Sequence, residues 1–204
     1  MNFMVRRILP LLLLIAGMLS AEGRLILLIG PPGSGKTTQA QFLKKKYGYA
    51  VISADDLIRD NPQALNPRKE TGVDNIEPHS DPALNQLVKT QLKSADLSKG
   101  VILDGYPATK DHADFLVALM PEMSLPVPTI IWLDIPDTEA RERIMKRKTP
   151  GETEAIFDQR IKDYHREMDF IHLYFPKAKI TRIDATKKPG AVSKSLEALL
   201  NAKN

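Results

Sequence analysis

The segment of this chain whose residue types and spacing are best suited to chemistry is a glycine-rich run that ends in lysine and threonine. Within GPPGSGKTTQ, the residues Gly30, Gly35, Lys36 and Thr37 fit the pattern G-x-x-x-x-G-K-[ST]. Glycines let backbone N–H groups converge on phosphate oxygens with no Cβ in the way. The pattern predicts a loop that binds ATP, with Lys36 reaching the β- and γ-phosphates and the Thr37 hydroxyl coordinating Mg²⁺.

The elements on either side of this loop are those that phosphate binding requires. The run RLILLIG, from Arg24 to Gly30, is continuously apolar, which is typical of a strand buried on both faces of a parallel sheet. A helix predicted over about Lys36 to Tyr47 directs its positive N-terminus at the same anion. We therefore expect these residues to contact the triphosphate: Gly30, Gly33, Ser34, Gly35, Lys36, Thr37 and Thr38.

Four further apolar runs predict the rest of a sheet. They begin at Ala50, Val101, Thr129 and Ala178, and helical stretches separate them. Repeated β–α units predict an α/β domain with a parallel sheet and helices on both faces. Ligands of such sheets bind beyond the carboxyl ends of the strands. The polar residues at those ends are therefore candidates for a site: Ser53, Asp104, Asp134 and Asp184.

The composition limits the class of protein. A chain of 204 residues with 43% apolar residues is long enough for one domain with a sizeable core. Its formal net charge of +4 is too small to indicate a nucleic-acid groove, so we expect no nucleic-acid partner. The absence of cysteine excludes disulfides, thiolate catalysis and cysteine-ligated zinc.

Residues 1–21 have the pattern of a secretory signal peptide. A basic start, MNFMVRR, precedes an apolar run from Ile8 to Leu19 and a small residue near its end. The run is shorter than the roughly 20 residues of a membrane-spanning helix, so we expect no stable membrane insertion after the leader is removed. A signal peptide predicts an exported protein, whereas translation from Met18 predicts a cytoplasmic one. In both cases the folded domain is expected to span residues 22–204.

Two segments interrupt the β–α pattern. The stretch from Asp60 to Pro82 is rich in proline, asparagine and charge, and it predicts a mobile insertion or loop. The stretch from Lys146 to Arg160 is a shorter excursion with a turn at Pro150 and Gly151. Mobile elements over a phosphate site exclude water while a phosphoryl group is transferred, so both segments fit a kinase.

Six segments of the chain, in the same order, resemble the adenylate kinase family of nucleoside monophosphate kinases. They are GPPGSGKTTQA, ISADDLIR, VILDGYPAT, WLDIPDTEARERIMKR, QRIKDYHREMDFIHLYF and IDATKKP, and together they cover nearly everything after the leader. The resemblance implies a P-loop NTPase fold with a five-stranded parallel sheet in the order 2-3-1-4-5. It also implies an acceptor-binding insertion over 54–88 and a short lid over 148–160.

The resemblance implies roles for the residues around the transferring phosphate. Lys36, Arg147 and Arg160 correspond to catalytic residues, with Arg147 on the phosphates of ATP and Arg160 bridging donor and acceptor. Arginine suits these positions because its planar fork grips phosphate oxygens bidentately. Arg143, which shares a helix face with Arg147, corresponds to the residue that stacks on the adenine of ATP. Asp104 corresponds to the carboxylate that holds Mg²⁺ through water.

The acceptor side is where the chain departs from the family. Ser53, Asp56, Arg59 and His112 are the expected acceptor-binding residues, with Arg59 gripping the acceptor phosphate. However, Ala108 stands where the family has a phosphate-binding arginine, and His112 stands where it has a glutamine that reads the adenine of AMP. Whether AMP is the acceptor is therefore open.

The start of the helix that follows this segment offers two substitutes. Lys110 is a candidate for the missing positive charge, and His112 for contact with a different base or sugar. The alternative for both residues is an exposed helix start without a role in binding. The exposed helix start is the interpretation that we favour for both residues.

Three functions are consistent with these residues. The first is Mg²⁺-dependent phosphoryl transfer from ATP to a nucleoside monophosphate by a monomeric enzyme. The second is transfer to the hydroxyl of a different small molecule, which needs a general base, with Asp56 as the candidate. The third is a nucleotide-binding protein that has lost turnover.

Overall fold

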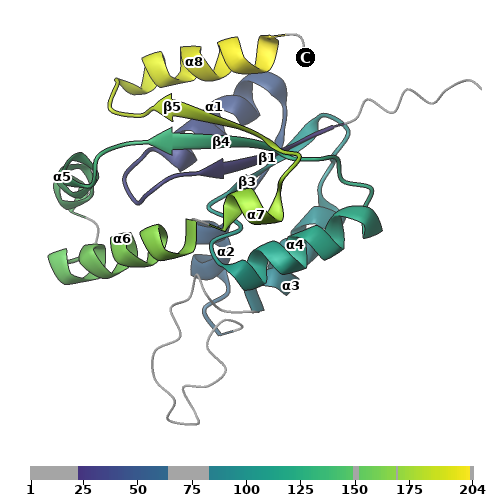
Figure 1. Cartoon of the computed structure of the whole chain (residues 1–204), viewed down its shortest axis with the longest axis horizontal. Coiled ribbons are helices and arrows are strands. Elements are labelled where there is room, and N and C mark those ends of the chain that lie inside the picture. Colours follow the sequence, from purple (N-terminus) through teal and green to yellow (C-terminus); the bar gives the residue numbers. More distant parts are fainter. Residues whose placement is uncertain (1–22, 64–82, 149–151, 169, 203–204) are drawn as a thin grey trace, which may run out of the picture.

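The computed structural model describes residues 23–63, 83–148, 152–168 and 170–202 (Figure 1). The predicted leader at 1–21 lies outside these residues, and its removal stays a prediction. Residues 64–82 of the expected acceptor-binding insertion and 149–151 of the expected lid also lie outside them. Among the described residues, no helix combines the length and apolar character needed to span a membrane.

The strands form one parallel sheet in the order β2-β3-β1-β4-β5. This confirms the predicted α/β fold of the P-loop NTPase type and its strand order. The apolar runs predicted as strands coincide with the strands of the structure. These are β1 (Arg24–Ile29), β2 (Ala50–Ser53), β3 (Gly100–Asp104), β4 (Thr129–Asp134) and β5 (Lys179–Asp184).

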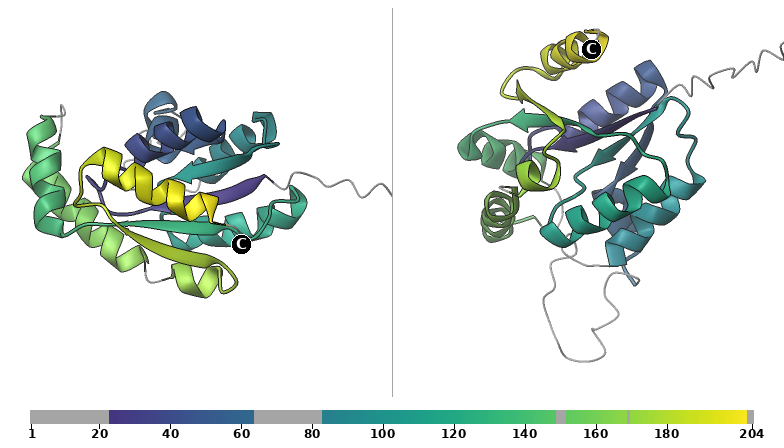
Figure 2. Two further views of the ribbon diagram at one scale, coloured as in Figure 1. Left: turned by 90° about the horizontal axis from the view of Figure 1, so that it is seen from above. Right: turned by 45° about the vertical axis from the view of Figure 1, so that its right-hand side comes forward.

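Helices cover both faces of this sheet. In Figures 1 and 2, α1 and α8 lie on one face and α3, α4 and α7 on the other, while α5 and α6 lie at the carboxyl ends of the strands. The helices described are α1 (Lys36–Tyr47), α2 (Ala54–Asp60), α3 (Ala83–Ser94), α4 (Lys110–Glu122), α5 (Asp137–Arg147), α6 (Glu154–Met168), α7 (Ile171–Tyr174) and α8 (Pro189–Asn201).

The central strand β1 supplies side chains to two hydrophobic cores. Leu25, Leu27 and Ile29 pack into the core beneath α3 and α4, whereas Ile26 and Leu28 pack into the core beneath α1 and α8. Successive side chains of a strand point to opposite faces, so a continuous apolar run is what a strand covered on both faces requires. The glycine loop therefore starts from a strand that is packed on both faces.

Short capping contacts fix where the helices begin at the carboxyl edge of the sheet. The Ser53 side chain, at the end of β2, accepts a hydrogen bond from the backbone N–H of Asp56 at 3.2 Å and starts α2. Thr109 does the same for the backbone N–H of His112 at 3.2 Å and starts α4. Such N-caps leave the first turn of each helix next to the end of a strand.

Shortening one buried side chain of β1 should show how much the stability of the fold depends on the packing of this strand. Leu27 is fully buried, so Leu27→Ala should lower the free energy of unfolding by about 3 kcal/mol, through lost burial and the cavity left behind. Leu173→Ala is the matched control, because Leu173 is 78% exposed, and it should change stability by less than about 0.5 kcal/mol. Urea unfolding of both variants measures this, and equal losses would contradict it.

Candidate active site

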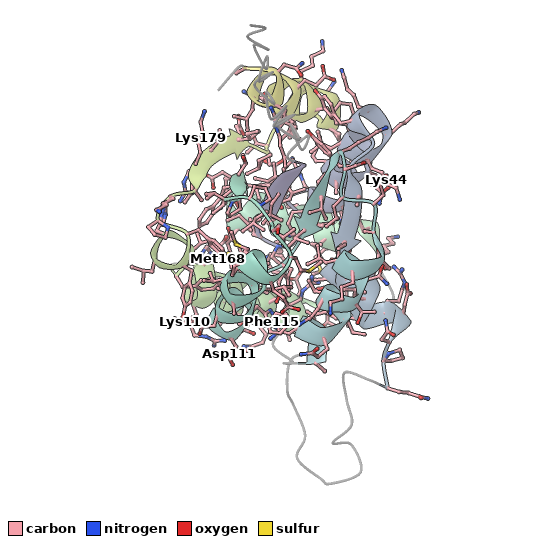
Figure 3. All side chains as sticks on the ribbon, turned by 90° about the vertical axis from the view of Figure 1, so that its right-hand side faces the viewer. Lys44, Lys110, Asp111, Phe115, Met168 and Lys179 are labelled. Atoms are coloured by element: carbon pink, nitrogen blue, oxygen red, sulfur yellow. The ribbon has the colours of Figure 1, made fainter. Side chains whose placement is uncertain are left out.

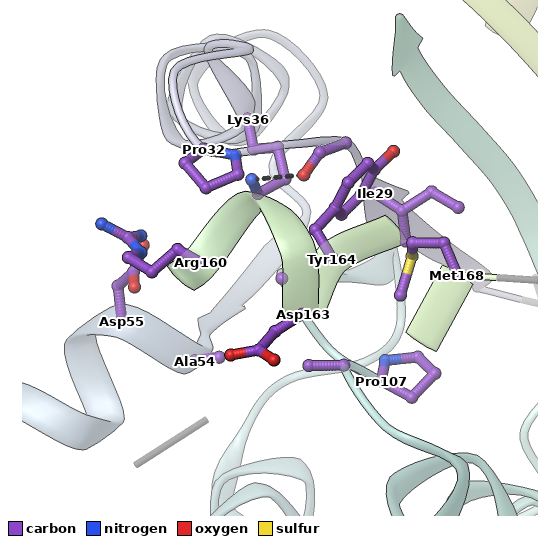
Figure 4. A pocket seen from close by; sticks show the side chains of 13 residues that line it. Ile29, Pro32, Lys36, Ala54, Asp55, Pro107, Arg160, Asp163, Tyr164 and Met168 are labelled. Atoms are coloured by element: carbon purple, nitrogen blue, oxygen red, sulfur yellow. Dashed lines mark hydrogen bonds between the residues drawn. The ribbon is translucent and has the colours of Figure 1, made fainter. Parts of the chain in front are cut away.

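Two pockets flank the glycine loop at the carboxyl edge of the sheet. The first, here named the α5 pocket, lies between the loop, α5 and the segment that joins β5 to α8. The second, named the α6 pocket, lies between the loop, α2, the segment that joins β3 to α4, and α6 (Figure 4). Lys36 lines the α6 pocket, and the neighbouring Gly35 lines the α5 pocket. The loop therefore lies between two pockets, and each of them could hold one ligand.

The backbone of the loop is shaped for an anion. Gly33 and Gly35 have φ angles of 82° and 90°, in the left-handed region that favours glycine. A Cβ on Gly33 would lie 2.7 Å from the carbonyl oxygen of Ala140, so no larger residue fits there without a shift. Gly35 caps α1 without a side-chain hydrogen bond, and the buried Ser34 hydroxyl has no hydrogen-bond partner. These groups are the donors that a phosphate at a helix N-terminus uses.

Lys36 bridges the two ends of the loop. Its Nζ donates to the carbonyl oxygen of Gly30 at 2.8 Å, drawn in Figure 4, and to that of Pro31 at 3.1 Å. A phosphate entering the loop would offer the same ammonium a charged acceptor in place of these two carbonyls, which makes a stronger hydrogen bond.

Charges from four other elements act on Lys36. Burial lowers the pKa of Lys36, the carboxylates of Asp104 and Asp55 act against this, and Arg160 and Arg147 add to it. Lys36 and Arg160 line the α6 pocket and Arg147 lines the α5 pocket, so the fold brings the three predicted catalytic residues to the two sides of the glycine loop, although they are far apart in sequence. Such a cluster of cations suits a ligand with several negative charges.

Asp104 ends β3 beside this cluster, and it is almost completely buried. Burial raises its pKa to about 6, and the charge of Lys36 and the neighbouring Thr37 hydroxyl act in the opposite direction. One carboxylate oxygen, Oδ2, is buried without a hydrogen-bond partner. A buried acceptor of this kind costs stability unless a ligand satisfies it.

The residues present fit a magnesium ion that is held mainly by phosphate. Among the described residues, no three histidine, cysteine or acidic side chains gather into a metal cluster. Magnesium needs no such cluster, because it is usually held by one or two carboxylates together with waters and substrate phosphates. The unpartnered oxygen of Asp104, next to Thr37 and the loop, is the protein ligand that this arrangement needs.

Arg143 joins α5 to the segment after β5. Its Nη1 donates to the carbonyl oxygen of Ala185 at 2.8 Å, and its Nη2 donates to that of Thr186 at 3.0 Å and to Glu139 at 2.6 Å. Arg143 and Arg147 both line the α5 pocket, as expected from their shared helix face. The guanidinium of Arg143 therefore forms part of the wall on which a planar base could stack.

Gln39 and Ser193 hold the opposite wall, and sequence reasoning assigned neither a role. The Gln39 side chain is buried, donates to the carbonyl oxygen of Pro189 at 3.2 Å and accepts from the Ser193 hydroxyl at 2.8 Å. These bonds tie α1 to the start of α8 and fix the segment from Ala185 to Pro189. The signal that could have found Gln39 is its position one turn before the buried Leu43, which places a polar residue on the buried face of α1.

The α6 pocket is walled by one face of α6. Arg160, Tyr164 and Met168 follow each other at intervals of four, and Asp163 lies beside them. Asp55 on α2 faces this wall (Figure 4). Sequence reasoning singled out only Arg160 from this set. The four-residue spacing from Arg160 was the signal available for Tyr164 and Met168, whereas nothing in the pattern distinguished Asp55 from Asp56.

The residues predicted to bind the acceptor do not line the α6 pocket. Arg59 and Asp56 form an ion pair of 2.7 Å, as their spacing of three suggests, and Arg59 also donates to Asp60. The Arg59 side chain is 66% exposed. Ser53 caps α2, and none of Ser53, Asp56 and Arg59 lines the α6 pocket. A role for Arg59 in gripping a phosphate therefore requires its side chain to exchange Asp56 and Asp60 for the ligand.

His112 is buried, so the interpretation of this residue as part of an exposed helix start is wrong. Its ring stacks on Tyr106 with 4.9 Å between the ring centroids, and its Nδ1 accepts from the backbone N–H of Ala108 at 3.4 Å. The cap at Thr109 turns the first residues of α4 so that His112 points inward. Lys110 is exposed, as that interpretation expected, and Figure 3 shows it at the edge of the molecule.

Comparison with known proteins agrees with this geometry. A family model described as adenylate kinase matches residues 28–180. The chain is 34% identical over 185 residues to an adenylate kinase of Micrococcus luteus, covering 87% of this chain and 89% of that protein. It is 34% identical over 191 residues to an adenylate kinase of Mesorhizobium japonicum, covering 87% and 96%. It is also 39% identical over 125 residues to one of Methanosarcina barkeri, covering 60% and 58%.

The buried carboxyl of Asp104 should make the stability of the ligand-free protein depend on pH. Because its pKa in the folded state is about 6, above the ordinary 3.8, the contribution of this group is fully present below about pH 4 and is lost as the pH rises through 6. Asp104→Asn removes the ionisation. The variant should be more stable than the wild type by about 2 kcal/mol at pH 8 and nearly equal to it at pH 4.

Urea unfolding at both pH values, without nucleotide or divalent cation, measures the difference. Asp111→Asn is the matched control, because Asp111 is exposed and lines neither pocket. A difference between Asp104→Asn and the wild type that is the same at both pH values would show that ionisation of Asp104 is not the cause.

Proposed function

Because the chain belongs to the adenylate kinase family, we propose that it transfers the γ-phosphoryl group of ATP to a nucleoside monophosphate, giving ADP and a nucleoside diphosphate. The observation that carries this proposal is that Lys36 and Arg160 line one pocket and Arg147 lines the other, on the two sides of a glycine loop that lies next to the buried carboxylate of Asp104. A phosphoryl donor and a phosphoryl acceptor need this cluster of positive charge between them.

The α5 pocket is the proposed site of ATP. The amides of the glycine loop and the N-terminus of α1 would bind its β- and γ-phosphates, and Arg147 would bind the same group from α5. Arg143 and the segment held by Gln39 would enclose the base. Arg143 and Gln39 are held on this side by hydrogen bonds to the segment from Ala185 to Pro189, so little ordering remains for ligand binding.

The α6 pocket is the proposed site of the acceptor. When bound with ATP, Mg²⁺ supplies charge neutralisation of the phosphates, with Asp104 and Thr37 as its protein contacts. Lys36 and Arg160 would stabilise the charge on the transferring group from two sides. Arg160 Nη1 lies 2.9 Å from Glu152 Oε2, so a phosphate would compete with this carboxylate for the guanidinium. No general base is required when the acceptor is itself a phosphate.

One observation favours a second candidate, transfer to the hydroxyl of a small molecule. Such a reaction needs a carboxylate that can accept the hydroxyl proton. Asp55 lines the α6 pocket, whereas Asp56, the base expected from sequence, is ion-paired with Arg59. In this candidate the base is therefore Asp55.

Removing the ammonium of Lys36 should abolish phosphoryl transfer. Lys36→Met should lower kcat at least about 10²-fold, because the charge that stabilises the transferring group is lost. The measurement is transfer of label from [γ-³²P]ATP to a panel of nucleoside monophosphates and small alcohols with Mg²⁺. Lys44→Met, an exposed lysine on the same helix, is the matched control.

The panel also separates the candidate functions. Label on a nucleotide supports the first function and label on an alcohol supports the second. A protein that binds ATP but labels nothing has lost turnover. Undiminished transfer by Lys36→Met would rule out the glycine loop as the phosphate site.

Adding a cation at Ala108 should strengthen binding of a phosphate acceptor. Ala108 lines the α6 pocket, and Ala108→Arg should lower the KM for a nucleoside monophosphate by about tenfold while the KM for ATP changes little. Ala202→Arg adds the same charge at an exposed position outside both pockets and serves as the control. Steady-state kinetics measure both constants, and an unchanged acceptor KM would mean that the acceptor phosphate does not approach Ala108.

A further inference from the structure

One wall of the α6 pocket is the segment from Gly105 to Ala108, which joins β3 to α4. Gly105, Pro107 and Ala108 line the pocket (Figure 4). Tyr106 points the other way, into the core beneath α3 and α4, where its side chain is fully buried. The position of this segment therefore sets part of the shape of the space that an acceptor would enter.

The first end of this segment lies beside Lys36. The backbone N–H of Gly105 donates to the carbonyl oxygen of Leu28 on β1 at 3.2 Å. A Cβ on Gly105 would lie 3.8 Å from the Cβ of Ala54 and 3.9 Å from the Cε of Lys36, which is ordinary van der Waals contact. A shift of the segment would therefore change the space next to the ammonium that is proposed to stabilise the transferring group.

The second end of the segment is held by the side chain of His112. Its Nδ1 accepts from the backbone N–H of Ala108 at 3.4 Å, and its ring stacks on Tyr106 with 25° between the ring planes. The Tyr106 hydroxyl donates to Asn85 Oδ1 on α3 at 2.5 Å and to the carbonyl oxygen of His112 at 3.2 Å. The cap at Thr109 fixes the backbone of His112 as well. The ring is thus held in place on the side away from the pocket.

His112 itself does not reach the acceptor space. Its exposed fraction is 0%, and among the described residues that line the two pockets it is absent. A residue at this place in the fold could act on an acceptor by touching its base or by holding the wall that the acceptor contacts. Burial argues against the first, and the hydrogen bond to Ala108 provides the second.

We propose that His112 is a positioning residue for the acceptor, which holds the segment from Gly105 to Ala108 against Lys36 and α2 and does not read the base. The inference rests on the proposed function in that a nucleoside monophosphate enters the α6 pocket. A residue that hydrogen-bonds a base discriminates between bases. A residue that holds a wall of the pocket acts on every nucleoside monophosphate alike, so the choice of base is not made at His112.

Two variants separate the hydrogen bond of His112 from the bulk of its ring. His112→Phe keeps a ring that can stack on Tyr106, but it removes the acceptor for the N–H of Ala108. His112→Asn places Oδ1 at the same number of bonds from Cα as Nδ1, so it can restore this hydrogen bond. Leu119→Ala is the matched control, because Leu119 is buried on the same helix, two turns further on, and lines neither pocket.

Calorimetry measures the Kd of four nucleoside monophosphates with a nonhydrolysable ATP analogue and Mg²⁺ present. His112→Phe should raise each Kd by about fivefold, and by the same factor for the four bases, because the hydrogen bond that fixes the wall is lost. The Kd values of His112→Asn and Leu119→Ala should stay within about twofold of the wild type. The Kd of the ATP analogue should stay within about twofold of the wild type in all three variants.

Hydrogen exchange of the Ala108 amide, followed by NMR without ligand, measures the contact directly. Exchange should be about fivefold faster in His112→Phe than in the wild type, because the N–H has lost its acceptor. His112→Asn should exchange at close to the wild-type rate. Equal rates in His112→Phe and the wild type would show that the contact does not hold the segment, and would overturn the proposal.

A rise in Kd that is confined to one base also overturns the proposal, because it would mean that His112 contacts the base. An equal rise in His112→Phe and His112→Asn, or in Leu119→Ala, does the same. Label transfer tests the proposed function separately. Transfer to a nucleoside monophosphate together with a base-dependent rise would refute the inference and leave the function standing. An equal rise for the four bases without any transfer would do the reverse.

Discussion

The site depends on one electrostatic constraint, which is that a lysine and a carboxylate are kept close together where little water reaches them. Burial moves the pKa of Lys36 down and that of Asp104 up to about 6, even though each charge stabilises the other. Desolvation therefore outweighs the attraction between the two groups. A polyphosphate for the ammonium and a cation for the carboxylate would relieve both costs, so the strain of the ligand-free site favours binding of the two together.

The rest of the fold maintains this constraint. The strand β1 is packed into two cores, and it delivers the loop to a fixed point next to the end of β3, where Asp104 lies. Around that point the described lining of the α5 pocket holds five cationic side chains and no carboxylate, whereas the lining of the α6 pocket holds two cations and two carboxylates. Under the proposed function, the α5 pocket would hold the triphosphate and the α6 pocket would hold the acceptor of the phosphoryl group.

The part of the site that could be predicted is the part in which local sequence alone fixes geometry. A glycine loop between an apolar strand and a helix has a characteristic conformation. The bounds of the helix, Lys36 to Tyr47, and the residues of the loop could therefore be predicted from the sequence pattern. The resemblance to the adenylate kinase family adds the strand order and brings Arg143, Arg147 and Arg160 to the loop. The positions of these three arginines match the expectation because members of a family share the strand order and the helix faces that face the site.

The sequence by itself determined the α/β fold, the phosphate loop and the carboxylate at the end of β3. Only the tertiary structure decided which of two neighbouring residues faces a pocket and which lies in the core. Asp55 lines the α6 pocket and Asp56 does not, and His112 lies inside the protein beside Tyr106. The physical reason is that spacing fixes which side chains share a face of a helix, but the rotation of the helix about its axis is set by what it packs against. For α2, burial of Ala54 and Leu57 sets that rotation, and the neighbouring charges take the directions that remain.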